Sequence, residues 1–297
     1  MSKSRLTFAL LALAFFGGRA EAQAPGRAWL VPFDELERRL PDPDLRLLDA
    51  RPKADYDRGH IPGAVWVDVK AVEALAAKPG ALADRATWEA WIAPLGIGPK
   101  SEVVVYDASR QLAAARIWWL LGYLGVERVG LLNGNFRLWA EGGHPVTAEV
   151  KPVAPQPFPV AFRKDRHATQ EEVLAALGSK TGAILDARSD EEYVGSKKLS
   201  KRAGHIPTAC HLEWSQLVDP DGRFLDDATL RAKLAKAGVD PGVPVITHCQ
   251  GGGRASVNAF VLEHLGYHAR NYYLGWSDWG NAEATPVQLD EPAGPKD

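Results

Sequence analysis

The sequence predicts an α/β protein of two tandem domains, each built around a central parallel sheet flanked by helices. Three observations support this prediction. Short apolar runs alternate with longer helical stretches, which is the rhythm of an α/β domain. A set of short motifs occurs twice in the same order, and a proline-rich segment separates the two copies. The length of 297 residues also suits two domains of ordinary size.

The repeat is clearest at two short motifs. Asp-Ala-Arg at 49–51 returns 137 positions later, at 186–188. Gly-His-Ile-Pro at 59–62 returns at 204–207, after an insertion of eight residues. Such residues commonly cap or shape a turn, and for the first copy we expect no more than that. Further along, the stretch EVVVYDASR of the first copy lines up with PVITHCQGGGR of the second.

The strands and helices of each copy follow from the apolar residues. Near-continuous apolar runs are typical of parallel strands that are buried on both faces. In the first copy they predict strands at 45–48, 103–105 and 129–132, with a helix at 113–125. In the second copy they predict strands at 183–185, 245–247 and 271–274, with a helix at 255–266. The two copies therefore share one order of elements.

The first 24 residues have the layout of a secretory signal peptide. Lys3 and Arg5 precede an apolar run at 6–16, and Ala-Gln-Ala at 22–24 offers a small-x-small cleavage site. The run is shorter than the roughly 20 residues that cross a bilayer, although a retained membrane anchor is an alternative. Cleavage would give a periplasmic or secreted protein that has no membrane attachment.

The proline-rich segment marks the domain boundary. Five prolines, at 145, 152, 155, 157 and 159, oppose regular structure and suit an extended linker. We place the first domain at 25–148, the linker at 149–166 and the second domain at 167–297. The formal net charge of −2 provides no basic excess for a phosphate backbone, which argues against nucleic acid as a partner.

Two cysteines, Cys210 and Cys249, are too few for a disulfide scaffold. The two could pair with each other. The alternative for Cys210 is a small, buried, hydrophobic residue at the start of a strand, as free cysteines often are.

Cys249 is the strongest candidate for chemistry. It ends a predicted strand, and Gln250, three glycines and Arg254 separate it from a helix that we expect to open at Ala255. Glycines tolerate positive φ, which lets backbone N–H groups turn toward one point. Those groups and the positive end of the helix stabilise negative charge, so the loop favours the thiolate form of the cysteine and an anion beside it.

The spacing of this loop distinguishes two chemistries. Cysteine phosphatases place five residues between the cysteine and the arginine, a ring wide enough for phosphate. Here four residues separate Cys249 from Arg254, and Ala255 stands at the phosphatase arginine position. The shorter loop is better matched to a single sulfur atom held on the cysteine.

The tandem architecture, both copies of Asp-x-Arg and Gly-His-Ile-Pro, and the Cys-x4-Arg loop together resemble a two-domain rhodanese, a sulfurtransferase. The resemblance covers essentially all of the chain after residue 24. It implies two rhodanese-like domains with the active site in the second. It also implies that Cys249 takes a sulfane sulfur from a donor, holds it as a persulfide and passes it to a thiophilic acceptor such as cyanide. No cofactor is needed, because the persulfide forms on the protein itself.

The first domain lacks the nucleophile, because Asp107 stands at the position of Cys249. A carboxylate cannot act as the sulfur nucleophile. We therefore expect the first domain to be catalytically inactive and to form one wall of the cleft.

Thiosulfate is the donor that the charges favour. It is a dianion, which Arg254 and Arg188 together would suit, and Arg188 follows a strand at the edge where open α/β sheets bind ligands. Alternatives are 3-mercaptopyruvate or a polysulfide as donor, or a sulfur-carrier or redox protein of low turnover. The predicted donor-binding residues are Arg188, Arg254, Gln250, Gly251, Gly252 and Gly253.

Other polar features are assigned no catalytic role. His248 is next to Cys249, but successive strand residues point to opposite faces, so it should point away. The basic insertion at 195–203 is either a solvated loop or an arm that steers anions. The histidines have no metal-ligand spacing, and no nucleotide-binding fingerprint is present.

Overall fold

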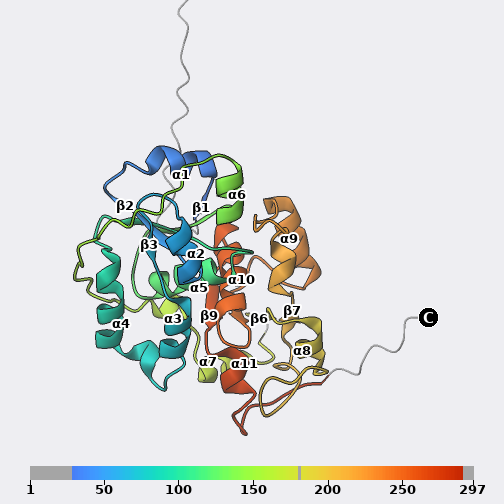
Figure 1. Ribbon diagram of the computed structural model, residues 1–297. Helices are drawn as coiled ribbons and strands as arrows, with labels where there is room; N and C mark the ends of the chain where they lie inside the picture. Colours follow the sequence, from blue (N-terminus) through green and yellow to red (C-terminus); the bar gives the residue numbers. More distant parts are fainter. Residues whose placement is uncertain (1–28, 180–181, 290–297) are drawn as a thin grey trace, which may run out of the picture.

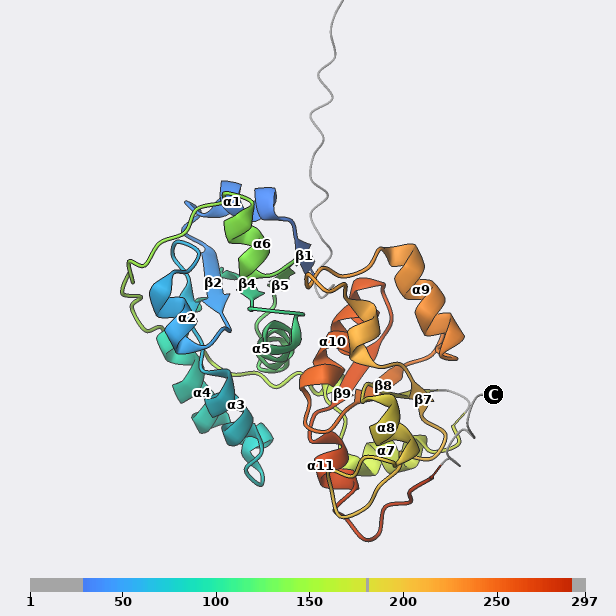
Figure 2. The ribbon, with the colours of Figure 1, turned by 45° about the vertical axis from the view of Figure 1, so that its right-hand side comes forward.

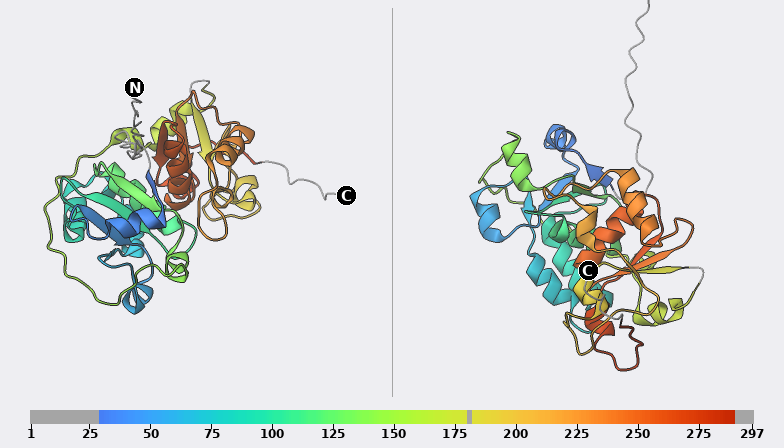
Figure 3. Two further views of the ribbon diagram at one scale, coloured as in Figure 1. Left: turned by 90° about the horizontal axis from the view of Figure 1, so that it is seen from above. Right: turned by 90° about the vertical axis from the view of Figure 1, so that its right-hand side faces the viewer.

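The computed structural model describes residues 29–179 and 182–289 (Figure 1). The segment 1–24, which the sequence assigns to a signal peptide, lies outside these residues. Within them the chain forms two α/β lobes that stand side by side, as the view from above shows (Figure 3). In the part of the chain that is described, no helix is long and apolar enough to cross a membrane.

The first lobe, as far as it is described, is built on a five-stranded sheet in the order β1-β5-β4-β2-β3, with every pair parallel. Its strands are β1 (Trp29–Val31), β2 (Leu45–Asp49), β3 (Val65–Trp66), β4 (Glu102–Tyr106) and β5 (Val129–Leu132). Its helices are α1 (Phe33–Arg39), α2 (Lys53–Arg58), α3 (Val69–Ala76), η1 (Ala81–Ala83), α4 (Arg85–Ile92), η2 (Ala93–Leu95), α5 (Leu112–Tyr123) and α6 (Phe136–Glu141).

The described part of the second lobe has a four-stranded parallel sheet in the order β7-β6-β8-β9. Its strands are β6 (Ala183–Asp186), β7 (Cys210–His211), β8 (Val245–His248) and β9 (Ala269–Tyr272). Its helices are η3 (Lys164–Arg166), α7 (Gln170–Ala176), α8 (Asp190–Val194), η4 (Trp214–Leu217), α9 (Asp227–Lys236), α10 (Gly253–His264) and α11 (Gly275–Trp279).

The two sheets repeat one topology, as the internal repeat predicts. The order β5-β4-β2-β3 matches β9-β8-β6-β7, strand for strand. An isolated antiparallel β-bridge at the histidine of the Gly-His-Ile-Pro motif also recurs. It joins His60 to Thr147 in the first lobe and His205 to Gln288 in the second. The α/β class with two parallel sheets flanked by helices is thus confirmed.

The predicted strands agree with the observed strands to within two residues at each end. The predicted helix at 255–266 differs in a way that matters: α10 begins at Gly253, two residues earlier. Glycines are poor helix formers in isolation, yet Gly253 and Arg254 occupy the first turn here, because the packing of Gly253 against the Arg116 guanidinium of the first lobe overrides that low propensity. Arg254 is therefore a helical residue and not part of an irregular loop.

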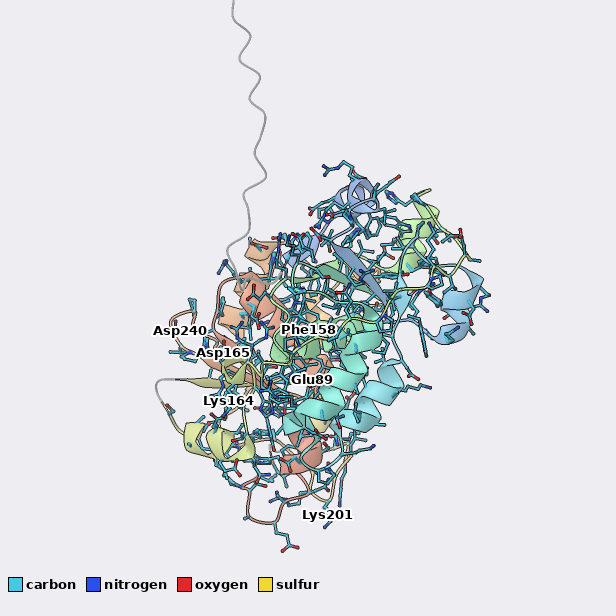
Figure 4. All side chains as sticks on the ribbon, turned by 90° about the vertical axis from the view of Figure 1, so that its left-hand side faces the viewer. Glu89, Phe158, Lys164, Asp165, Lys201 and Asp240 are labelled. Carbon is cyan, nitrogen blue, oxygen red and sulfur yellow. The ribbon has the colours of Figure 1, made fainter. Side chains whose placement is uncertain are left out.

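The linker runs along the first lobe and is tied to it by hydrogen bonds. The backbone N–H of Val160 donates to the Glu89 carboxylate of α4, and those of Gln156 and Ala161 donate to carbonyls of Ala93 and Leu124. Figure 4 looks onto this face, with Phe158 beside the helix that carries Glu89. The proline-containing part, 151–163, has no helix, and η3 forms only after the last proline, while hydrogen bonds to the first lobe fix the path of the segment.

The two lobes meet along α5 and α10, which lie next to each other at the centre of the molecule (Figure 2). Both helices are buried over most of their length. Trp118 of α5 and Phe260 of α10 pack edge to face, with ring centroids 5.0 Å apart. Because these helices follow β4 and β8, their N-terminal ends bring the loops after both strands close to the boundary between the lobes.

Candidate active site

Cys249 is held at the end of β8, a strand whose four residues are all buried. Its carbonyl accepts a hydrogen bond of 2.7 Å from the backbone N–H of Trp276. Gly275 has a φ of 56°, and a Cβ there would lie 2.1 Å from the Cys249 carbonyl oxygen. Only 1% of Cys249 is exposed, yet it lines a cavity of about 380 Å³ between the lobes.

The three glycines after Gln250 serve three different purposes. Gly252 alone has a positive φ, of 82°, and a Cβ there would lie 2.4 Å from the Tyr273 ring. A Cβ on Gly253 would lie 2.5 Å from Nη2 of Arg116. Gly251 has open space around it and lines the cavity. Positive φ is thus used at one of the three glycines, and close approach of a neighbouring side chain requires glycine at two of them, Gly252 and Gly253.

The N-terminus of α10 lies at the cavity that Cys249 lines, since Gly253 and Arg254 line it too. The helix has 12 residues and begins four positions after Cys249. Its first turn has N–H groups without partners inside the helix, and its dipole places partial positive charge at this end. The arrangement is suited to a thiolate or to an anion in the cavity.

Arg254 lines the cavity, and its guanidinium is fixed by a buried carboxylate. Its Nη2 lies 2.9 Å from Oε1 of Glu192, and its Nη1 bonds the other carboxylate oxygen. Only 3% of Glu192 is exposed, and its side chain also completes the capping box of α8 with Ser189. Burial opposes ionisation of Glu192, but the bond from Arg254 holds the pKa of Glu192 below its usual value.

Arg116 reaches the same cavity from the first lobe. Its Nη1 donates to the Gly251 carbonyl and to the Tyr273 hydroxyl, both at 2.8 Å, and its Nη2 lies 2.8 Å from Oε1 of Glu73. Burial works to lower the pKa of Arg116, but Tyr273, Glu73 and Cys249 outweigh it and raise that pKa. Sequence reasoning missed this residue. The signal was present, since Arg116 is the one charged residue in the apolar stretch at 113–125.

Arg188 is not where the sequence argument placed it. It is 1% exposed, its Nε lies 3.0 Å from both carboxylate oxygens of Asp186, and its Nη2 donates to the Gly204 carbonyl at 2.8 Å. Its guanidinium also lies over the Trp276 ring, and it is not among the residues that line the cavity. The prediction that Arg188 binds the donor is thus corrected.

The first copy shows why Arg188 turns inward. Arg51 makes the same contacts, to Asp49 and to the Gly59 carbonyl. The Asp-x-Arg motif ties the end of a strand to the Gly-His-Ile-Pro turn in both lobes. It therefore serves the fold and not the chemistry.

The remaining predicted residues fall on both sides of the cavity wall. Gln250, Gly251, Gly253 and Arg254 line the cavity together with Cys249, whereas Gly252 is not among the lining residues and lies against the Tyr273 ring. The Gln250 side chain is held by Ser200 of the basic insertion, at 3.1 Å between Nε2 and Oγ. His248 is fully buried away from the cavity, beside Asp186. The residues that complete the lining are Glu73, Ala77, Leu112, Arg116, Tyr273, Leu274 and Ser277.

Cys210 and Cys249 are both free thiols. Cys210 opens β7, as expected of a strand start, but it is partly exposed, and its Sγ lies 3.9 Å from the Gly238 carbonyl. The alternative of a disulfide between the two cysteines does not hold in this structure. Among the described residues, no group of His, Cys, Asp and Glu side chains is arranged to hold a metal ion.

Three comparisons with known proteins bear on this geometry. The family model of the rhodanese-like domain matches this chain twice, at residues 32–142 and at residues 169–282. A thiosulfate sulfurtransferase of Azotobacter vinelandii is 35% identical over 257 residues, which cover 86% of this chain and 95% of that protein. A sulfur carrier protein of Thermus thermophilus is 32% identical over 88% and 97% of the two chains. The solved structure of SseA from Escherichia coli, a 3-mercaptopyruvate sulfotransferase, matches with a TM-score of 0.72 at 28% sequence identity. The match covers 84% of this chain and 99% of that chain.

Proposed function

Because this chain belongs to the rhodanese-like domain family, we propose that it is a thiosulfate sulfurtransferase whose nucleophile is Cys249. The observation that supports this most strongly is the position of the thiol. Cys249 lines a cavity at the N-terminus of α10, where two guanidinium groups from different lobes also lie. A thiolate and an anionic sulfur donor can therefore meet in this cavity.

The proposed reaction has two balanced steps. The Cys249 thiolate attacks the outer sulfur of thiosulfate, a bond forms between the two sulfurs, and sulfite leaves with the electron pair of the broken S–S bond. The enzyme is then a persulfide anion. Cyanide attacks the terminal sulfur, thiocyanate leaves, and the thiolate returns.

The N-terminus of α10 has the same role in both steps. In the free enzyme the negative charge is on the Cys249 sulfur. In the persulfide it is on the transferred sulfur that is bonded to Cys249, and after the second step it is on the Cys249 sulfur again. Fixed N–H dipoles close to this point stabilise each of these states without rearranging. The position of Gln250 and Gly251 beside the cavity supports their backbone as part of this cradle.

The test is the rate of thiocyanate formation from thiosulfate and cyanide, with Cys249→Ser and Cys210→Ser as matched variants. We expect activity in the wild type and in Cys210→Ser, and none in Cys249→Ser. If 3-mercaptopyruvate supports activity and thiosulfate does not, the proposed donor changes to 3-mercaptopyruvate and Cys249 remains the nucleophile. A wild type that takes up sulfur but hardly turns over would favour a sulfur carrier, which one relative is named to be. Retained activity in Cys249→Ser would refute the assignment.

We also propose that the protein is exported, on the basis of the basic residues, apolar run and Ala-Gln-Ala site at its start. Expression of the full chain and of a form without residues 1–24, followed by cell fractionation and mass measurement, tests this. A shortened product outside the cytoplasm is expected for the full chain. An uncleaved product in the cytoplasm would contradict it.

A further inference from the structure

The two arginines of the cavity have carboxylate partners of opposite kinds. Glu192, the partner of Arg254, is almost fully buried, makes two contacts with the guanidinium and is fixed by its capping box. Glu73, the partner of Arg116, is 47% exposed and has one contact, at 2.8 Å. One ion pair is part of the core of the second lobe, and the other lies at the rim of the cavity.

This difference determines which pair an incoming anion can open. Separating Arg254 from Glu192 would leave a buried carboxylate without its partner, which is strongly unfavourable. The Glu73 side chain can instead rotate outward and become solvated. Exposed ion pairs of this kind contribute little to the stability of the protein. With both carboxylates in place the two guanidinium charges are already balanced, so a dianionic donor has to displace one of them to gain a full ion pair.

Arg116 would keep its position during such an exchange. Its Nη1 is held by the Gly251 carbonyl and the Tyr273 hydroxyl, and its guanidinium lies against the backbone of Gly253. Only Nη2 contacts Glu73. When Glu73 leaves, a fixed N–H donor faces a cavity that also contains Cys249.

We propose that Arg116, from the lobe without the nucleophile, is the binding site for the oxyanion group of the sulfur donor, and that Glu73 is the counter-ion it exchanges for the donor. The inference rests on the proposed sulfurtransferase function. The oxyanion is the sulfonate end of thiosulfate, or the carboxylate of 3-mercaptopyruvate if that is the donor. The cavity thus takes its nucleophile from one lobe and its exchangeable cation from the other.

The decisive variant is Glu73→Gln, because it removes a half-exposed charge and leaves Arg116 in place. Glu141→Gln is the matched control, since Glu141 is 57% exposed and pairs with Arg137 on α6, which does not line the cavity. Glu73→Gln should lower the KM for thiosulfate about threefold, the scale of one exposed ion pair. Glu141→Gln should leave it unchanged.

Arg116→Gln and Arg116→Lys complete the set, with each half-reaction followed separately. Both should slow sulfur loading at low thiosulfate, by at least about tenfold for the neutral glutamine, while discharge of the preformed persulfide to cyanide keeps its rate. Cyanide enters the cavity at neutral pH mostly as uncharged hydrogen cyanide, which loses its proton to water before the cyanide ion attacks, so its entry does not need Arg116. The same variants with 3-mercaptopyruvate show which donor uses the site.

The outcomes separate the two claims. A wild type that takes no sulfur from either donor refutes the proposed function. A wild type that loads normally, with the same KM in Glu73→Gln as in Glu141→Gln, refutes the assignment of Arg116 and Glu73 and leaves the function standing. A raised KM in Glu73→Gln refutes the exchange as well, because Glu73 would then support donor binding.

Discussion

The loops that follow β4 and β8 occupy the same place in two copies of one fold, and they differ in what fills them. In the first lobe the Asp107 carboxylate accepts backbone N–H bonds from Ser109, Ala113 and Ala114, at 2.9, 3.1 and 3.3 Å. In the second lobe Cys249 stands at this position and faces the cavity. The first loop shows that backbone N–H groups of the cradle bond a side chain at this position, although burial raises the pKa of Asp107, and the second loop places a reactive thiol there.

The second lobe also covers the loop that follows β4, whereas the loop that follows β8 faces the cavity. Arg110 donates to the Ser215 and Val218 carbonyls of the second lobe, and Gln111 donates to the Gly222 carbonyl. The Asp107 loop is therefore a contact between the lobes, and the Cys249 loop lies at a cavity between them. The comparison indicates that the cradle needs both a thiol and an opening to act as a site.

The largest effect is expected when the second loop is given the residue of the first. Cys249→Asp cannot form a persulfide, so thiocyanate formation should fall by at least about a thousandfold. The first turn of α10 follows Cys249 closely, as that of α5 follows Asp107, so we expect backbone N–H groups to bond the new carboxylate and the thermal midpoint to change little. Activity assays and thermal unfolding check this, and a large fall in the midpoint would show that the two cradles are not equivalent.

The next effect tests the inward-facing arginines of both lobes. Arg51→Gln and Arg188→Gln each leave a buried aspartate without its partner, so each should lower the free energy of unfolding by about 3–5 kcal/mol. The KM for thiosulfate of folded Arg188→Gln should equal that of the wild type. Urea unfolding and kinetics measure the two effects. A raised KM with normal stability would return Arg188 to the donor site.

A smaller effect is expected in the pH dependence of the free energy of unfolding, to which the second lobe contributes a buried histidine and the first lobe a tyrosine. His248 lies beside Asp186, with 3.5 Å between Nε2 and Oδ2, where the first lobe has Tyr106 beside Asp49. Burial lowers the pKa of His248 to about 4, from 6.5 in an unfolded chain. The unfolded state therefore binds the proton first as the pH falls. Stability is complete above about pH 6.5 and is lost toward pH 4, by about 2 kcal/mol between pH 7.5 and pH 5.

His248→Gln should remove this part of the acid sensitivity, as urea unfolding at the two pH values would show. His167, whose pKa burial also lowers to about 4, keeps its own share. Tyr106, whose pKa burial raises, does not titrate in this range. An unchanged pH dependence in His248→Gln would mean that this histidine is not the group responsible.

The smallest effect is expected at Cys210. Its thiol is partly exposed at the edge of the hydrophobic core, and its Sγ lies 3.9 Å from the Gly238 carbonyl. Cys210→Ser should change the free energy of unfolding by less than about 1 kcal/mol and leave sulfur loading intact. Loss of loading would indicate that this thiol takes part in the sulfur transfer.

The fold could be predicted because its signals are local. Apolar runs such as Val103–Val105 locate strands in any context, and the repeat of Asp-Ala-Arg and Gly-His-Ile-Pro reveals the second domain. The helix start at Gly253 could not be read this way, because tertiary packing against Arg116 overrides the low helix propensity of glycine.

The site was predictable only where the chain itself brings residues together. Cys249, Gln250 and Arg254 are close in sequence, and the structure keeps them in one cavity. Arg116 and Glu73 join them across the boundary between lobes, a contact that no spacing in the sequence encodes. Arg188 was misplaced for the opposite reason: its position at a strand end is read correctly, but its side chain folds back onto Asp186.

The most direct test of the central claim is the intact mass of the protein without residues 1–24, reduced and then incubated with thiosulfate. We predict a gain of one sulfur atom, mapped to the peptide that contains Cys249 and absent in Cys249→Asp, while Asp107→Cys gains no second sulfur because its loop is covered. A wild type that gains no sulfur, or that carries it on Cys210, would contradict the account.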